Sequence, residues 1–170
     1  PFQLLALQEI YQENVHDAQL ALLVQQALLS AQLTIDAVDI VAVSGGPGSF
    51  TGTRIGMSLA KGLCYTQHPK LMVVDTMHAL AEASVEVATA AQQNTLTVVI
   101  ASHRDLVYVA QYPVQGAGTL LYRTEHDIQL VPISEVTGRT DLGLVCGPGA
   151  GKIIASPISG LTRLSSRFVA

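Results

Sequence analysis

Apolar residues in the first half of the chain recur alternately at the spacings of strands and of helices. Short aliphatic runs predict strands, and apolar positions three or four residues apart predict helices. The predicted elements are a strand over Leu4–Tyr11, a helix over Asp17–Leu33, a strand over Ile40–Val43, a helix over Ser49–Tyr65, a strand over Leu71–Val74 and a helix over Met77–Ala91. This alternation is typical of an α/β fold.

Longer β-type runs replace the alternation in the second half. They cover Leu96–Tyr112 and Thr119–Val131, and the glycines at positions Gly116 and Gly118 between them predict a hairpin. Leu142–Cys146 is predicted as a later strand.

A polar patch over Gln92–Asn94 marks the change of pattern. We therefore expect a first half over residues 1–93 and a partial second half over residues 94–170. The tail after Ile154 has too little periodicity to predict an element.

The predicted helix over Asp17–Leu33 has apolar residues on two sides. One broad face is formed by Leu20, Leu23, Val24, Ala27, Leu28 and Ala31. Glutamines separate this face from a second stripe formed by Leu22, Leu29 and Leu33. A helix that covers only its own sheet needs one apolar face. The second stripe therefore predicts contact with another helix, in this chain or in a partner.

The next predicted helix carries small residues at every fourth position. They are Gly52, Gly56 and Ala60, flanked by Ile55, Leu59 and Leu63. Small residues let another backbone approach closely, so the row serves either a partner helix or an internal helix pair. Arg54 and Lys61 lie on the polar side, where they are either solvated or in contact with a partner subunit or an anion between subunits.

Composition narrows the choice of partners. Apolar residues make up 49% of the chain and charged residues 13%, whereas charged residues average about 25% in soluble domains. Part of the apolar surface is therefore expected to meet a partner. The formal net charge of −4 comes without a basic stripe, so any role with nucleic acid is expected to be indirect.

Membrane and disulfide chemistry are not expected. No apolar run reaches the length that spans a bilayer, which predicts a soluble, cytoplasmic protein. Cys64 and Cys146 have no metal-type spacing, so we expect a reduced pair.

The segment Ser44–Leu63, SGGPGSFTGTRIGMSLAKGL, carries the most specific signal in the chain. Its glycines end a strand, and Ser49 offers a side-chain oxygen that caps the following helix. Backbone N–H groups and the positive end of a helix dipole meet there, so Gly46, Gly48 and Ser49 are candidates for binding an anion. The alternative is an ordinary tight turn, since the Gly-Lys-Ser/Thr ending of a P-loop is absent.

The sequence GGPGSFTGTRIG followed by AKGL resembles the signature of the TsaB family, also called YeaZ. The matched positions are Gly46, Pro47, Gly48, Ser49, Phe50, Thr51, Gly52, Arg54, Ile55, Gly56, Ala60, Lys61, Gly62 and Leu63. The order of predicted elements is similar to that family's from Leu4 to about Tyr112.

The resemblance implies an α/β, actin-like ATPase fold of the ribonuclease-H-like type, with two related halves. Family members open with a hairpin that carries an Ile-Asp-Thr type motif, and no such motif precedes Leu4. We therefore expect the N-terminal strands to be missing from this chain. Where the family commonly has an Asp-Ala-Arg run, this chain has the residues Ala101, Ser102, His103 and Arg104.

The resemblance also implies a non-catalytic role. The chain would be a scaffold or dimerisation subunit for TsaD, which, with the ATPase TsaE, transfers a threonylcarbamoyl group to N6 of adenosine 37 in tRNAs that read ANN codons. It would form a heterodimer with TsaD, a ternary complex with TsaE and a homodimer when alone, and it would contact tRNA only indirectly and no membrane. The implied interface residues are Leu22, Leu29, Leu33, Gly52, Arg54, Gly56, Leu59, Ala60 and Leu63.

Catalytic constellations are sparse in the sequence. The histidines show neither an HExxH motif nor the paired HxxxH of TsaD homologues, so no metal, no other cofactor and no catalytic residue is expected. Gly147–Lys152, GPGAGK, resembles half a Walker motif, but Cys146 stands where its first glycine belongs and Ile153 replaces its Ser/Thr.

Two alternatives of other classes stay open. An active actin-like ATPase or sugar kinase would use the glycine turn together with an acidic strand that faces the phosphates. A metallopeptidase-like glycoprotease would need metal ligands that the sequence does not supply.

Overall fold

The computed structural model describes residues 3–10, 16–65, 68–115, 119–120 and 127–154. These residues divide into two compact units. The first unit comprises the described residues up to Gly45 together with Ser49–Val74. The second comprises Gly46–Gly48 and the described residues from Asp75 onward.

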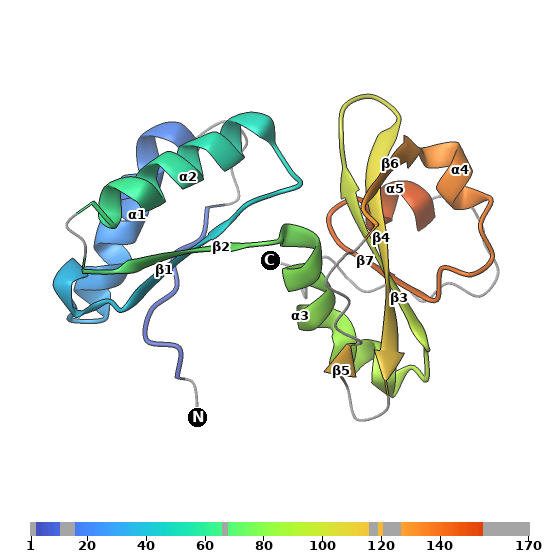
Figure 1. Cartoon of the computed structure of the whole chain (residues 1–170), viewed down its shortest axis with the longest axis horizontal. Coiled ribbons are helices and arrows are strands. Elements are labelled where there is room, and N and C mark those ends of the chain that lie inside the picture. Colours follow the sequence, from blue (N-terminus) through green and yellow to red (C-terminus); the bar gives the residue numbers. More distant parts are fainter. Residues whose placement is uncertain (1–2, 11–15, 66–67, 116–118, 121–126, 155–170) are drawn as a thin grey trace. The chain divides into compact units, whose positions relative to one another are not determined.

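The first unit is a pair of parallel strands with helices packed on it (Figure 1). Its elements are helix α1 (His16–Ser30), the short 3-10 helix η1 (Ile35–Ala37), strand β1 (Ile40–Ser44), helix α2 (Phe50–Leu63) and strand β2 (Lys70–Val74). β1 runs parallel to β2, with Ile40 opposite Lys70 at one end and Ser44 opposite Val74 at the other. α2 packs on β1, and α1 packs on α2.

Helix α1 ends earlier than the predicted end at Leu33. Gln32 has a positive φ of 57°, and the N–H of Leu33 donates to the carbonyl of Leu28 at 2.9 Å. A left-handed residue followed by such a backward bond is a standard helix stop. Ser30 is therefore the last helical residue.

The predicted strand over Leu4–Tyr11 is wrong within the described residues. Residues 3–10 form no regular structure, and Tyr11 lies outside the described ranges. A strand is held by backbone hydrogen bonds to a neighbouring strand, whereas β1 and β2 pair only with each other. The segment's exposed apolar side chains include Leu4, Leu5 and Leu7.

The second unit is a mixed sheet with helices on both faces. Its elements are α3 (Thr76–Ala90), β3 (Thr95–Ala101), β4 (Leu106–Gln115), β5 (Thr119–Leu120), β6 (Gln129–Pro132), α4 (Ile133–Thr137), β7 (Leu144–Cys146) and α5 (Ala150–Ile154). The strand order is β5-β4-β3-β7, and β6 also pairs with β4. β3 is antiparallel to β4 and parallel to β7.

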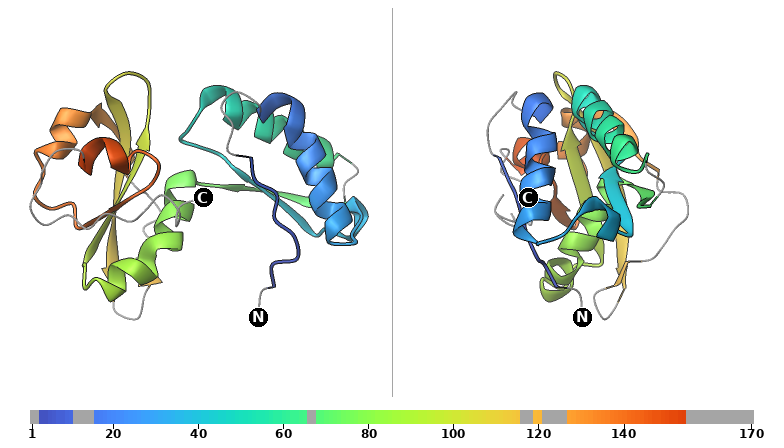
Figure 2. Two further views of the ribbon diagram at one scale, coloured as in Figure 1. Left: turned by 180° about the vertical axis from the view of Figure 1, so that it is seen from behind. Right: turned by 90° about the vertical axis from the view of Figure 1, so that its left-hand side faces the viewer.

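Strand β3 lies at the centre of the core, and every residue from Leu96 to Ile100 is buried. On one face, α3 packs its buried side against the sheet. On the other face, Val136 of α4 and Ile153 of α5 join the second core cluster. A strand covered on both faces reads as a continuous apolar run, which explains the sequence LTVVI. Figure 2 shows the sheet and its helices from two further directions.

The β-type run predicted over Leu96–Tyr112 is divided between two strands, because the chain reverses inside it. The N–H of Ser102 donates to the carbonyl of Leu106 at 3.0 Å, and Arg104 has a positive φ of 54°. The polar residues between β3 and β4 therefore form a tight turn, and the predicted β-type run is a hairpin.

The predicted run over Thr119–Val131 is a strand only near its ends, in β5 and β6, since residues 121–126 lie outside the described ranges. Gly116 and Gly118 also lie outside them. β4 and β5 pair antiparallel on either side of this point, with Val114 opposite Leu120.

The two compact units separate between Val74 and Asp75, whereas the predicted halves meet at residues 92–94. The difference is the placement of α3. Met77, Ala81 and Val85 of this helix are buried against the second unit's sheet. Because its apolar side is buried against that sheet, α3 belongs to the same unit as the strands that follow it in the chain.

Candidate functional site

The glycine turn joins strand β1 to the starts of two helices. The N–H of Gly45 donates to the carbonyl of Val74 at 2.8 Å and so extends the parallel pair. Gly46 has a positive φ of 100°. Its N–H donates to Oγ1 of Thr76 at 3.1 Å, and the N–H of Thr76 donates to the Gly46 carbonyl at 3.0 Å. The turn is therefore bonded to the first residue of α3.

Ser49 caps helix α2, as the sequence predicts. Its Oγ accepts a hydrogen bond from the N–H of Gly52 at 3.2 Å, and its carbonyl accepts one from Oγ1 of Thr53 at 2.8 Å. Of the three candidates for anion binding, Gly46 and Ser49 thus use their polar groups internally. The anion site at Gly46, Gly48 and Ser49 stays a prediction.

α1 has apolar residues on both predicted sides, but Leu33 of the predicted second stripe lies beyond the end of the helix at Ser30. Leu23, Val24, Ala27 and Leu28 are half-buried on the side that packs in the unit. The second stripe is exposed: the exposed fraction is 49% for Leu22, 69% for Leu29 and 37% for Leu33. We call these three residues the leucine stripe. It remains uncovered within the described residues.

The small-residue row of α2 faces the unit's own strand in part. A Cβ at Gly56 would lie 3.5 Å from Cγ2 of Val43 in β1, and Ala60 is buried, with 4% exposed. Gly52 lies beside its own cap, Ser49. Close approach at Gly56 and Ala60 therefore serves packing inside the first unit. Of the other interface candidates, Leu59 and Leu63 are half-buried.

Arg54 and Phe50 form a stacked pair on the outer side of α2. The Arg54 guanidinium carbon lies 3.9 Å from the centre of the Phe50 ring. Arg54 is exposed, and 70% of Phe50 is exposed. A guanidinium stacked on an aromatic face gains roughly 0.5–1 kcal/mol at an exposed site, so the stacked arrangement is favoured only modestly.

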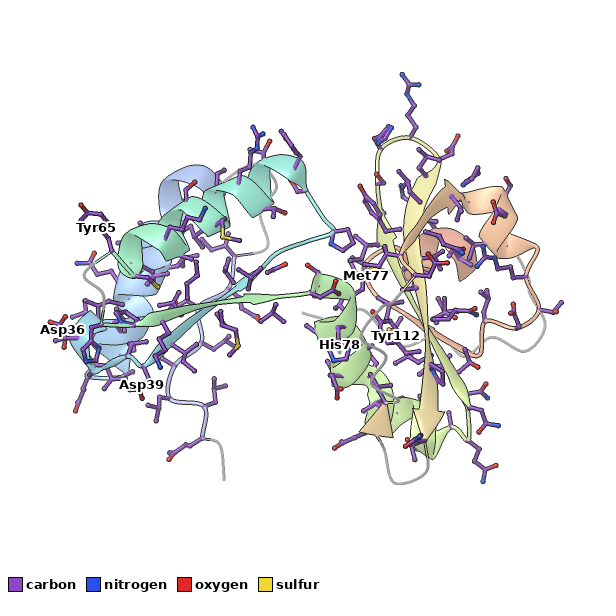
Figure 3. The ribbon with its side chains drawn as sticks, in the orientation of Figure 1. Asp36, Asp39, Tyr65, Met77, His78 and Tyr112 are labelled. Atoms are coloured by element: carbon purple, nitrogen blue, oxygen red, sulfur yellow. The ribbon has the colours of Figure 1, made fainter. Side chains whose placement is uncertain are left out.

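Exposed large apolar side chains gather in the first unit. Eleven of the twelve in the described chain belong to it: Leu4, Leu5, Leu7, Leu22, Leu29, Leu33, Ile40, Phe50, Tyr65, Met72 and Val73. Figure 3 shows one of them, Tyr65, at the end of α2. Contiguous exposed apolar patches mark interaction surfaces. The first unit, which contains α1 and α2, therefore carries the candidate interface.

The titratable cluster of the second unit lies in its core. The rings of His78 and Tyr112 lie with their centres 5.9 Å apart and their planes tilted by 52°, and both side chains are labelled in Figure 3. Burial, with smaller contributions from Asp75 and Cys146, raises the pKa of Tyr112. Burial also raises the pKa of Cys146, against a hydrogen bond with Ser84. Both acids are therefore neutral near pH 7, which suits a packing role.

The glycines of the half Walker sequence have a structural explanation. The N–H of Gly149 donates to the carbonyl of Val99 at 2.9 Å, and a Cβ at Gly149 would lie 2.8 Å from the N atom of Ala101. Gly147 has a positive φ of 97°. These glycines let the loop before α5 lie directly on β3, and Lys152 is exposed beyond them.

Two searches over the described residues complete the inventory of sites. No group of three or more His, Cys, Asp or Glu side chains there is placed to hold a metal ion. None of the described helices combines the length and apolar character that crossing a membrane requires.

Comparison with known proteins decides the family. Residues 9–128 match the family model described as TsaD, tRNA N6-adenosine threonylcarbamoyltransferase. The match takes in more than half of the chain. The chain belongs to this family. The match includes the glycine turn and both helices that carry the candidate interface.

Relatives within the family carry two names. The tRNA threonylcarbamoyladenosine biosynthesis protein TsaB of Haemophilus influenzae is 27% identical over 99 residues, which cover 58% of this chain and 41% of that protein. The tRNA N6-adenosine threonylcarbamoyltransferase of Symbiobacterium thermophilum is 29% identical over 134 residues, which cover 78% of this chain and 38% of that protein. The chain thus spans about two fifths of the length of the curated relatives it matches.

A solved structure supports the same assignment at the level of fold. YeaZ from Pseudomonas aeruginosa superposes with a TM-score of 0.69 at 23% identity, covering 92% of this chain and 73% of that one. The predicted resemblance to the TsaB (YeaZ) family and the predicted actin-like α/β fold are confirmed.

Proposed function

We propose that this chain is a TsaB-type, non-catalytic subunit in the formation of threonylcarbamoyladenosine in tRNA. Family membership supports the proposal, as does the relative whose name assigns it to the biosynthesis of this modified nucleoside. The chain binds TsaD and supports transfer of the threonylcarbamoyl group to N6 of the tRNA adenosine. TsaD supplies the chemistry, and TsaE joins the pair in a ternary complex.

The observation that carries the proposal is the leucine stripe on α1. Leu22 and Leu29 face solvent on a helix whose other side is already packed, and the exposed Leu33 follows the end of that helix. Covering apolar surface gains roughly 25 cal/mol per Å², so a partner helix laid along the stripe would be bound mainly by burial. This is the contact that a scaffold subunit needs.

The same surface would support a homodimer when TsaD is absent. One stripe cannot be covered by two partners at once, so self-association and binding of TsaD would compete. Contact with tRNA would be indirect, because the chain has a formal net charge of −4 and binding to a phosphate backbone depends on clustered cations.

Reconstitution tests the proposal directly. The protein should co-purify with the TsaD homologue of its own organism, and tRNA modification by TsaD and TsaE should depend on its addition. Full modification in its absence, with the other components unchanged, would refute the proposed role.

An actin-like ATPase or sugar kinase is the second candidate, and the glycine turn between β1 and α2 favours it. The turn presents a helix start next to a strand end, the usual position of a phosphate. ATP turnover by the purified protein that is lost on Ser49→Ala would support this candidate over the scaffold.

A further inference from the structure

The sheet of the first unit is a single parallel pair, so β2 has an outer edge that no described strand covers (Figure 1). The hydrogen bonds at the two ends of the pair fix which backbone groups face β1. The N–H of Lys70 donates to the carbonyl of Asp39 at 2.8 Å, and the carbonyl of Val74 accepts from the N–H of Gly45 at 2.8 Å. The first and last residues of β2 therefore direct their backbone groups toward β1.

The residues between them alternate in direction. Met72 faces β1, as its neighbours two positions away do, and the N–H and C=O groups of Leu71 and Val73 face the outer edge. Among the residues that the structure describes, no strand bonds to these outward groups. Unpaired N–H and C=O groups along a sheet edge are a template for a further strand.

The outer edge of β2 has few of the features that prevent such pairing. Proteins protect sheet edges with charged residues, prolines or bulges. The only charge in the strand, KLMVV, is that of Lys70 at its first position. Met72 is 47% exposed and Val73 is 56% exposed. A strand added at this edge would therefore bury apolar side chains as well as backbone groups.

Met72 also belongs to an exposed apolar face of the sheet. Val43 of β1 faces Gly56 of α2, and side chains alternate between the two faces along a strand. Ile40 and Ala42 therefore lie on the face away from α2, and Ala42 is in register with Met72. Ile40 is exposed. Apolar surface on this face thus continues up to the edge.

A second copy of β2 fits this edge in the antiparallel direction. A two-fold axis at Met72 places Leu71 of each copy opposite Val73 of the other. Each of these pairs exchanges two N–H···O bonds in an antiparallel ladder, so the outward groups of both strands are bonded, and the two copies of Met72 form the closely spaced pair between them. Lys70 lies opposite Val74 of the other copy, so no like charges are directly opposed.

We propose that two copies of the chain pair through the outer edges of their β2 strands and so form one continuous sheet. The contact uses residues other than the leucine stripe, and it goes beyond the proposed function because it does not depend on binding of TsaD. A two-fold contact closes on itself and therefore produces a dimer rather than a filament.

Proline at the outer edge tests the contact. The N–H of Val73 makes no bond to β1, so Val73→Pro removes an outward donor at a position where strands tolerate proline. Leu29→Ser is introduced first, to remove self-association through the leucine stripe. In that background, sedimentation should show a dimer whose association Val73→Pro weakens at least tenfold. A background variant that is monomeric at every concentration tested overturns the proposal, as does a dimer that Val73→Pro leaves intact.

Ala42→Pro is the matched control. By the same alternation, the N–H of Ala42 faces the outer edge of β1, so this variant removes one outward donor from the other side of the same sheet. It should leave the dimer unchanged. If Ala42→Pro abolishes dimer formation and Val73→Pro does not, the contact lies on β1 and the proposal is wrong.

Hydrogen exchange of the wild-type protein supplies a test that needs no proline variant to fold. The amide hydrogens of Leu71 and Val73 should exchange more slowly as the protein concentration rises, because the dimer bonds them. The amide of Ala42 should show no such change. Exchange at Leu71 and Val73 that does not depend on concentration would overturn the proposal. Protection that appears only when TsaD is added would also overturn it, because it would assign the edge to a strand of TsaD.

Discussion

In the second unit, apolar side chains of α3, α4 and α5 enclose a mixed sheet, and the residues of β3 from Leu96 to Ile100 are all buried. In the described first unit, Ala60 and Pro69 are the buried apolar residues, although strands and helices are equally regular there. The contrast lies in the sheets. A pair of strands has little surface to cover, and stable sheets generally need a third strand or packing against a helix.

The comparison teaches that regular secondary structure and a buried core are separate properties. Parallel strands are usually covered on both faces, yet Ile40 of β1 and Met72 of β2 are exposed. The first unit therefore holds apolar surface that its own helices do not cover. Exposed apolar surface is typical of binding sites. In the second unit, by contrast, the apolar residues are buried in the core, where they stabilise the fold.

The largest expected effect comes from truncating one leucine to alanine in each unit. Leu144 is fully buried, and 69% of Leu29 is exposed. Leu144→Ala should lower the free energy of unfolding by about 2–5 kcal/mol through lost packing and a cavity. Leu29→Ala should change it by less than about 0.5 kcal/mol. Urea unfolding of both variants measures the difference, and equal losses would break the comparison.

Two glycines should respond to alanine with opposite signs. Gly46 has a positive φ of 100°, so Gly46→Ala should cost about 1–3 kcal/mol of strain. Gly62 lies in α2 with open space around it, so Gly62→Ala should stabilise the helix by about 0.5–1 kcal/mol. Thermal unfolding of the two variants is the measurement. A harmless Gly46→Ala would show that the turn adapts easily.

Alkaline pH should destabilise the second unit through Tyr112. Burial raises the pKa of Tyr112 above the ordinary 10.0, so the folded state favours the neutral phenol. Its contribution is fully present below pH 10 and is lost as the pH rises further, with a slope of at most about 1.4 kcal/mol per pH unit. Tyr112→Phe should flatten this decline, whereas Tyr65→Phe, at a side chain 87% exposed, should not. An identical alkaline slope in both variants would exclude Tyr112 as its source.

A small effect is expected at the cap of α2. Ser49→Ala removes the hydrogen bond from Gly52 and should destabilise the first unit by about 1 kcal/mol. It should leave ATP hydrolysis at the background level, because the proposed role is non-catalytic. Circular dichroism and a phosphate-release assay check the two parts. Measurable ATP hydrolysis that is lost in Ser49→Ala would indicate that the first unit has a catalytic role.

The sequence by itself determined the elements whose cause is local. The periodicity of α1 and α2, the cap at Ser49 and the glycine end of β1 follow from residues a few positions apart, and all are present. The apolar residues on both sides of α1 were also predictable, since a helical wheel requires only the sequence of the helix. The signature around Gly46 was specific enough to indicate the family that the comparison then confirmed.

Only the tertiary structure decided which of these features face outward. From the sequence, the small-residue row could contact either a partner or another part of this chain. The structure shows that Gly56 faces Val43 of β1. The polar residues 102–105 interrupt the run over Leu96–Tyr112, but the reversal there became clear only from the antiparallel pairing of β3 with β4. The segment at residues 3–10 has a strand-like sequence, but no described strand pairs with it. Helices close their hydrogen bonds within a few residues, whereas strands and interfaces depend on partners that are distant in the chain.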